Sequence, residues 1–541
     1  MSPPPQEHFP SRQYRYPKAA GRALELVAPD IELQAGTVYR FVLGRDEAPQ
    51  PMSREEIEGA LHDPFARMAL TRNDLPLTLK AVLALFDRAD LGLTEQKAFV
   101  VADGGQVPWS PETADLKRSF RFVITRGRPN QLPDVFVSTS SAFGSEDSFL
   151  QVVGWDPVAG AHQFYDRRHG AWVWAGGSWD ALAPATRGKG PFDSHVNGAL
   201  NMKELKPPWI HWHSMAARIP DDSLAPGDPL RQETIWTERR PAQQLEVEII
   251  RPGIDRWNEA RFRACQADGR LHRLPEFFRQ VLGTSTVNLV SSPDESRTLA
   301  PGKTMTLPLT FFVNSDALVD ELGLDPGIAS VPTVEAGVYL ECLRRYDVAI
   351  TDGAHRFAGD THFAFVVPEP AFEDLLVLRK LRVLGLLPDK LAASLLMVDF
   401  CNPVFSARRA ALLAHVPGSA SIGSASDFPG SFVEQVATAA ATLPPGSPEH
   451  EFLDNWRLPD DAWRPEYEAR LSAFFAASTG RLQSVGEFAP LFELAESRRR
   501  EFRRRPLGTE FRLTTPITNI SEDAPLLELT PDARVRPKTV P

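Results

Sequence analysis

Cysteine is scarce in this sequence of 541 residues. It contains only Cys265, Cys342 and Cys401, which are far apart, and no Cys-x-x-Cys pair. This spacing argues against a thiolate zinc knuckle or an iron–sulfur cluster, since both usually use neighbouring cysteines. A sparse, odd number of cysteines is typical of a reducing compartment. Residues 1–10 show no basic start and no apolar run, so we expect no secretory signal and a cytoplasmic protein.

Long apolar runs and several common catalytic motifs are also missing. The two most apolar windows, residues 79–86 and 383–398, contain charges or proline, so we expect no membrane span. No Gly-x-Gly-x-x-Gly follows an expected strand, and Walker A, Gly-x-Ser-x-Gly and His-Glu-x-x-His do not occur. These absences argue against a Rossmann nucleotide site, a P-loop, an elbow-type serine hydrolase and a zincin.

The charge balance is acidic, with a net charge of −11. This disfavours nucleic acid as a main partner, because phosphate binding needs a basic surface. The apolar share of 43% and the charged share of 24% are ordinary for a globular protein. The length exceeds what one hydrophobic core usually serves, so we expect either roughly two to four domains or one core with large elaborations.

Hydrophobic periodicity predicts strands first and helices later. Alternating or short apolar segments predict strands at residues 37–43, 119–125, 135–139, 149–155, 162–165, 171–174, 244–250, 305–313 and 361–367. A capping box at Ser53–Glu56 predicts a helix to about residue 69. Further helices are expected at residues 77–90, 371–386, 388–399, 429–443, 464–478 and 485–503. We therefore predict an α+β fold with a strand-rich N-terminal two-thirds and a helical C-terminal third.

Composition divides the chain into four expected regions. These are an N-terminal arm at 1–30, a mixed α/β region at 31–130, a β-rich region with the expected site at 131–368, and a helical region at 369–541. The Gly/Ser-rich segment 417–431 predicts a linker or a mobile lid carrying Phe428. The arginine run at 498–505 is interpreted as the solvated end of a helix, with a subunit contact as the alternative.

Histidine clusters in residues 191–214. His195, His211 and His213 fall within nineteen positions, and Glu204, Trp209 and Trp212 lie among them. Neutral imidazole is the commonest metal ligand in proteins, so this segment is where a cofactor is expected first.

The segment around His195 resembles the haem-attachment segment of c-type cytochromes. In that family Cys-x-x-Cys-His binds haem, and the two cysteine positions here are Pro191 and Ser194. The resemblance implies either haem held without covalent attachment, with His195 as the proximal iron ligand, or a site that has lost haem altogether. The alternative from the residues alone is that His195 is a loop histidine that hydrogen-bonds the backbone. With haem bound, the resemblance further implies His211 or His213 as a distal acid/base, and Trp209 and Trp212 as lining of the pocket. Arg408 and Arg409 are candidates for a carboxylate or a haem propionate, because guanidinium binds such anions in a bidentate manner.

Two other metal sites remain open. On a strand, His211 and His213 would face the same side and share a zinc ion, with Glu204 as base. His355, Asp360 and His362 offer a two-histidine, one-carboxylate set for non-haem iron. Cys401 is a nucleophile only if a neighbouring base lowers the pKa of its thiol, and is otherwise a packing residue.

These patterns together predict an iron-dependent oxidoreductase, with haem preferred, that acts on a small or lipid-like organic substrate. A zinc-dependent hydrolase or hydratase and a non-enzymatic scaffold are the alternatives. The oligomeric state is left open by the sequence.

Overall fold

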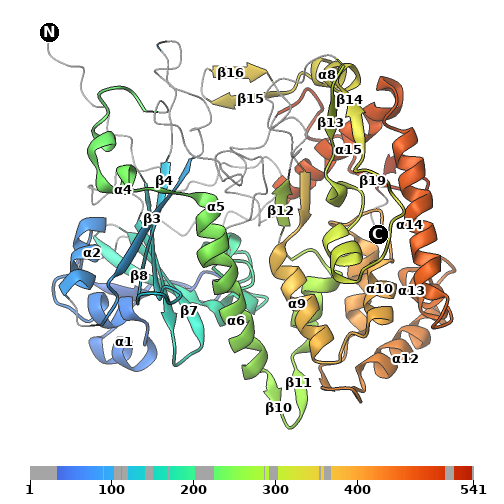
Figure 1. Ribbon diagram of the computed structural model, residues 1–541. Helices are drawn as coiled ribbons and strands as arrows, with labels where there is room; N and C mark the ends of the chain where they lie inside the picture. Colours follow the sequence, from blue (N-terminus) through green and yellow to red (C-terminus); the bar gives the residue numbers. More distant parts are fainter. Residues whose placement is uncertain are drawn as a thin grey trace. The chain divides into compact units, whose positions relative to one another are not determined.

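The computed structural model describes residues 33–88, 91–102, 111, 120–140, 150–168, 170–200, 224–285, 287–290, 302–352, 355–358, 367–505 and 517–538. The chain divides into two compact units. Unit 1 comprises residues 1–200 and 218–253, and unit 2 comprises residues 201–217 and 254–541. The main sheet lies in unit 1 and most long helices lie in unit 2, which confirms the α+β class (Figure 1).

Unit 1 is built on a nine-stranded sheet in the order β2-β1-β8-β7-β6-β5-β4-β3-β9. The strands from β3 to β8 form an antiparallel meander, whereas β1 pairs with β8 and β9 pairs with β3 in parallel. The expected strands at the centre of this sheet are confirmed. The strands are β1 (Val38–Arg40), β2 (Gln50–Pro51), β3 (Glu95–Ala102), β4 (Phe120–Gly127), β5 (Val135–Ser140), β6 (Leu150–Asp156), β7 (Ala161–Arg168), β8 (Ala171–Gly177) and β9 (Arg240–Pro241).

One face of this sheet is covered by α1 (Arg54–Ala60), the π-helical turn η1 (Ala66–Leu70) and α2 (Leu79–Arg88) (Figure 1). The capping box is confirmed, because the Ser53 side chain accepts from the Glu56 backbone and the Glu56 side chain accepts from the Ser53 backbone. The helix ends at residue 60 rather than 69, since proline at position 64 cannot continue it. The buried core on this face includes Tyr165 and Trp172.

The opposite face of the sheet contacts the segment that follows β8. Neighbouring side chains on a strand point to opposite faces, so Phe164 lies across the sheet from Tyr165. Phe164 packs with Val42, Ala181 of α3 (Ser178–Leu182) and Phe192 of the 3₁₀ turn η3 (Gly190–Asp193). The other helical elements of unit 1 are η5 (Pro229–Gln232), α4 (Thr234–Thr237), α5 (Ala242–Leu245) and η6 (Glu246–Ile250).

Unit 2 is mainly helical, and α6 (Arg251–Ala264) enters it from unit 1 at Ile254. Its helices are α7 (Leu274–Leu282), α8 (Ala336–Arg345), α9 (Phe372–Val383), α10 (Asp389–Leu396), α11 (Ala407–Ala411), α12 (Phe428–Ala440), α13 (Pro448–Trp456), α14 (Trp463–Gly480) and α15 (Val485–Arg504), with turns η7 (Leu309–Phe311), η8 (Asp316–Glu321) and η9 (Leu412–His415). The five helices expected after residue 370 are confirmed. No helix among the described residues is long and apolar enough to cross a membrane.

Short strand pairs complete unit 2. They are β10 (Gln266–Ala267), β11 (Arg270–His272) and β18 (Ser419–Ser421) in one sheet, and the pairs β12 (Val287–Val290) with β17 (Val367–Pro370), β13 (Thr304–Thr306) with β14 (Thr333–Glu335), β15 (Ala349–Asp352) with β16 (His355–Ala358), and β19 (Leu527–Leu529) with β20 (Val535–Pro537). The strand expected at 305–313 is β13 followed by η7, and most of the one expected at 361–367 lies outside the described residues.

The strand expected at residues 244–250 is wrong. This segment is helical, as α5 and η6. Leu245, Val247 and Ile249 alternate as in a strand, but Val247 is 53% exposed while Leu245, Ile249 and Ile250 are buried. Leu245 and Ile249, four residues apart, fit one helical face, whereas Leu245 and Ile250, five residues apart, would lie on opposite faces of a strand.

The segment 417–431 is not a linker or lid. Ser419–Ser421 pairs as β18 with β11, and Phe428 begins α12. The Phe428 side chain is fully buried, stacked on Phe278 with ring centroids 4.4 Å apart. Packing of one aromatic ring therefore fixes a segment whose composition alone indicates flexibility.

The first half of the arginine run is not solvated either, whereas Arg504 at the end of the helix is exposed. Arg498, Arg499 and Arg500 on α15 are buried, at most 3% exposed. Arg498 donates to the carbonyl oxygens of Phe311 and Cys401. Arg500 donates to the carbonyl oxygens of Ala524 and Pro525. The run therefore ties the loop at Phe311 and the C-terminal segment 517–538 to α15, within unit 2.

Candidate functional site

The loop that carries His195 is firmly packed on unit 1. Ser178 at the start of α3 donates its hydroxyl hydrogen to the carbonyl of Gly198 at 2.6 Å, and the Ser178 Oγ accepts the His162 backbone N–H at 2.9 Å. Gly198 has φ of +76°, and a Cβ there would lie 2.4 Å from the Ser178 carbonyl oxygen. Only glycine fits this close approach, so the loop has one well-defined path beside His195.

The His195 imidazole has a defined orientation and tautomer. Its Nδ1 lies 3.0 Å from the carbonyl oxygen of Ala199. A carbonyl oxygen only accepts, so Nδ1 carries a proton, and in the neutral imidazole Nε2 carries the lone pair. The ring is half-buried and packs on Phe164, with centroids 4.9 Å apart. Metal-ligating histidines commonly have this arrangement, in which the second ring nitrogen donates to a backbone carbonyl.

Most other residues expected at this site lie outside the described residues. They are Glu204, Trp209, His211, Trp212 and His213, and of the second histidine cluster Asp360 and His362. His355 is the first residue of β16. Among the described residues, no three His, Cys, Asp or Glu side chains are grouped so that they could hold a metal ion.

Arg408 lies on α11 in unit 2, whereas His195 lies in unit 1. Its guanidinium binds the Glu451 carboxylate at 2.7 Å and donates to the Gly446 carbonyl at 2.8 Å. The side chain is 40% exposed. The cation is therefore engaged in an ion pair of α13, and its role toward a haem propionate stays a prediction.

Cys401 follows α10 and is buried. Its thiol lies 3.1 Å from the carbonyl oxygen of Leu529 on β19. Burial raises the pKa of the Cys401 thiol, and the Asp399 carboxylate raises it further. A thiol with a raised pKa is a poor nucleophile, so the packing interpretation of Cys401 is the one that the structure supports.

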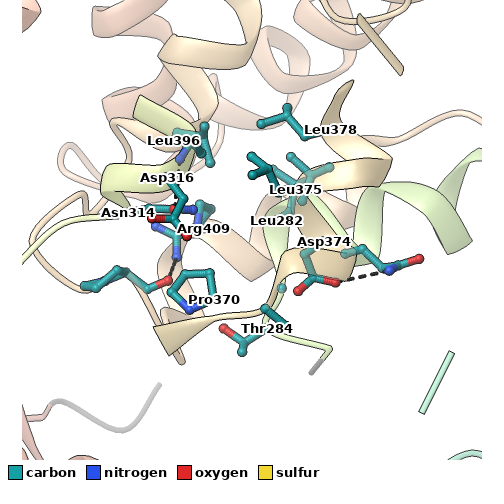
Figure 2. A pocket seen from close by; sticks show the side chains of 16 residues that line it. Leu282, Thr284, Asn314, Asp316, Pro370, Asp374, Leu375, Leu378, Leu396 and Arg409 are labelled. Carbon is teal, nitrogen blue, oxygen red and sulfur yellow. Dashed lines mark hydrogen bonds between the residues drawn. The ribbon is translucent and has the colours of Figure 1, made fainter. Parts of the chain in front are cut away.

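A cavity in unit 2 brings together polar residues that the sequence analysis did not single out, apart from Arg409. We call it the unit-2 cavity; Figure 2 shows Arg409 and Asp374 approaching it from opposite sides, with Pro370 and Thr284 along one edge. Its residues come from α7, η8, α9, α10 and α11 and the loops beside them: Gln280, Val281, Leu282, Gly283, Thr284, Asn314, Asp316, Ala317, Pro370, Ala371, Asp374, Leu375, Leu378, Leu396, Pro403 and Arg409.

Asp374 has the most perturbed environment in this cavity. Its Oδ1 accepts from Gln280 Nε2 at 3.1 Å and from the Ser285 hydroxyl at 3.0 Å. The Gln280 amide is oriented by Arg261, which donates to Gln280 Oε1 at 2.7 Å. Burial raises the pKa of Asp374 well above its usual range, and the Glu373 carboxylate raises it further. Burial therefore favours the protonated form of Asp374, and a protonated carboxyl can donate a hydrogen bond.

Burial also changes the pKa values of two arginines near Asp374. It lowers the pKa of Arg261 to about 10, and it lowers the pKa of Arg409 as well. Both guanidinium groups nevertheless remain charged at neutral pH. The sequence gives little indication of this site, because an acidic residue such as Asp374 is common in the first turn of a helix.

Comparison with known proteins gives no relative for this arrangement. No family model matches the chain, and no curated protein and no solved structure matches it.

Proposed function

We propose that this protein is an iron-dependent oxidoreductase that holds haem through His195. The observation that carries the proposal is the hydrogen bond from His195 Nδ1 to the Ala199 carbonyl. In the neutral imidazole this bond leaves the lone pair on Nε2, and histidine binds iron in that form. We further propose a small or lipid-like organic substrate and a cytoplasmic location.

The donor chemistry of the described residues fits haem. Haem needs only one or two protein ligands, because the porphyrin supplies the equatorial nitrogens. The half-buried His195 ring, which packs on Phe164, offers one such ligand. When bound, haem supplies one-electron and oxygen chemistry.

The remaining residues of the proposed site belong to segment 201–223, outside the described residues. With haem bound, His211 or His213 would serve as an acid/base, with Glu204 as a further acid/base, and Trp209 and Trp212 would line the pocket. The contact between Ser178 and Gly198 holds the loop, which keeps the His195 imidazole in the orientation proposed for binding iron.

The test is the visible spectrum of the purified protein, followed by titration with hemin. We expect a Soret band in the wild type, and its loss or a clear shift in His195→Asn. Asparagine can still donate an amide hydrogen to the Ala199 carbonyl, so the loop should keep its fold while the iron ligand is gone. His272→Asn removes an exposed histidine of β11 and is the matched control.

Two results would overturn the proposal. A colourless protein that fails to bind added hemin has no haem function. A protein that contains stoichiometric zinc and no iron, lost on changing His211 or His213, is instead the zinc hydrolase or hydratase that the histidine pair allows.

A further inference from the structure

Arg409 brings a buried positive charge to the edge of the unit-2 cavity. Its guanidinium donates to the carbonyl oxygens of Val398 at 3.3 Å, Asn402 at 3.3 Å and Pro403 at 2.8 Å. The side chain is only 4% exposed. Among the described residues, no carboxylate forms an ion pair with it, and its nearby countercharges are the Asp399 and Glu451 carboxylates, which oppose the lowering of the pKa of Arg409 by burial. Buried charges are normally paired, so a cavity beside this cation favours an anionic occupant.

Asp374 offers the second anchoring point. Gln280 and Ser285 both donate to Oδ1, which leaves Oδ2 as the oxygen that can bear the acid proton. The residue is 8% exposed and lines the same cavity. A neutral carboxylic acid there donates a hydrogen bond to an oxygen of a ligand.

The remaining walls set the size and polarity of the occupant. Leu282, Leu375, Leu378 and Leu396 give the cavity an apolar side (Figure 2). The space that the centre of a water molecule can occupy is about 30 Å³. By this measure the cavity holds about two or three waters, which is the size of a short organic acid. Asp316 also lines the cavity, and its negative charge favours a monoanion over a dianion.

We propose that the unit-2 cavity binds a short hydroxy or oxo monocarboxylic acid, with Arg409 holding the carboxylate and Asp374 donating to the second oxygen. The leucine side of the cavity accommodates the carbon chain. Two of the five guanidinium N–H donors of Arg409 remain for the ligand after the three carbonyl contacts. This site is independent of haem binding, since it uses residues of unit 2 alone.

Three related probes test the two polar contacts by calorimetric titration of the full chain. Lactate has both a carboxylate and a second oxygen, propionate lacks the second oxygen, and lactamide lacks the charge. We expect lactate to bind best and each of the others to bind about tenfold more weakly, since each loses one hydrogen-bonded contact. Lactamide that binds as well as lactate would overturn the role of Arg409, and propionate that does so would overturn the role of Asp374.

Substitutions locate the binding in the cavity. Ala317→Leu fills the space without removing a polar group and should abolish lactate binding, whereas Ala411→Leu on the exposed side of α11 should leave it unchanged. Asp374→Asn keeps a donor and should bind lactate within about threefold of wild type, but Asp374→Ala should lose about tenfold. Wild-type protein that binds no lactate at millimolar concentration, or an Ala317→Leu variant that binds it normally, would disprove the site.

Discussion

Replacing Asp63 with asparagine should change how the stability of unit 1 depends on pH. Asp63 is fully buried, and its Oδ1 accepts the backbone N–H groups of Phe65 at 2.9 Å and Ala66 at 3.1 Å. Its Oδ2 accepts the hydroxyl hydrogen of Tyr165. Burial dominates these hydrogen bonds and raises the pKa of Asp63 to about 6 from its ordinary value of 3.8.

The sign and size of the effect follow from proton linkage. Between pH 4 and pH 6 the folded state holds a proton on Asp63 that the unfolded state has released. The free energy of unfolding therefore falls as the pH rises through this window. At 1.36 kcal/mol per pKa unit, the difference between 3.8 and about 6 corresponds to about 3 kcal/mol. Asp63→Asn cannot titrate, so this part of the pH dependence should disappear.

The measurement is urea unfolding at several pH values from 4 to 7, read by pulsed hydrogen exchange and mass spectrometry. Peptides from β6 and β7 report unit 1 alone, which avoids averaging over two units. Tyr165→Phe is the second variant. The Tyr165 hydrogen bond lowers the pKa of Asp63, so its removal should extend the window to higher pH. Wild-type and Asp63→Asn curves that stay parallel from pH 4 to pH 7 would refute the reasoning.

Two further predictions concern unit 2. Phe428→Ala should cost about 3–5 kcal/mol of unfolding free energy, because Phe428 is buried against Phe278, and it should make segment 417–431 more sensitive than in the wild type to subtilisin, a protease of broad specificity. Glu496→Gln should cost a similar 3–5 kcal/mol, because it removes the buried carboxylate that Arg499 and Arg503 bind. The exposed pair of Glu466 with Arg470 is the control, and Glu466→Gln should cost less than about 1 kcal/mol in the same thermal or urea assay.

Local patterns predicted those parts of the fold that local forces determine. The Ser53–Glu56 capping box involves residues three positions apart and formed as expected. The meander from β5 to β8 also formed as expected, since short loops between alternating strands leave few other pairings. The strand predicted at residues 244–250 was wrong because Leu245 and Ile249 fit both a strand face and a helical face. The exposure of Val247 and the burial of Ile250 fit only a helix.

The candidate site was predictable only in part. The histidine-rich segment drew attention to His195, and the structure adds the carbonyl of Ala199, four residues away, that fixes its tautomer. The unit-2 cavity had no comparable local signal. Asp374 and Gln280 are 94 residues apart in sequence, and their contact depends on the packing of α7 on α9. Arg408 and Arg409 are adjacent in sequence, but Arg408 forms a partly exposed ion pair with Glu451, whereas Arg409 lines the cavity.

The arginine run shows why charge patterns alone cannot determine exposure. A buried guanidinium is stable only where oxygen atoms satisfy its donors. For Arg498 these oxygens belong to Phe311 and Cys401, 187 and 97 residues away, and for Arg500 they belong to residues 24 and 25 positions on. None of these carbonyls is recognisable from side-chain identity, because every residue has one. The one local sign was Glu496, three residues before Arg499, whose carboxylate provides the nearby countercharge on the same helix.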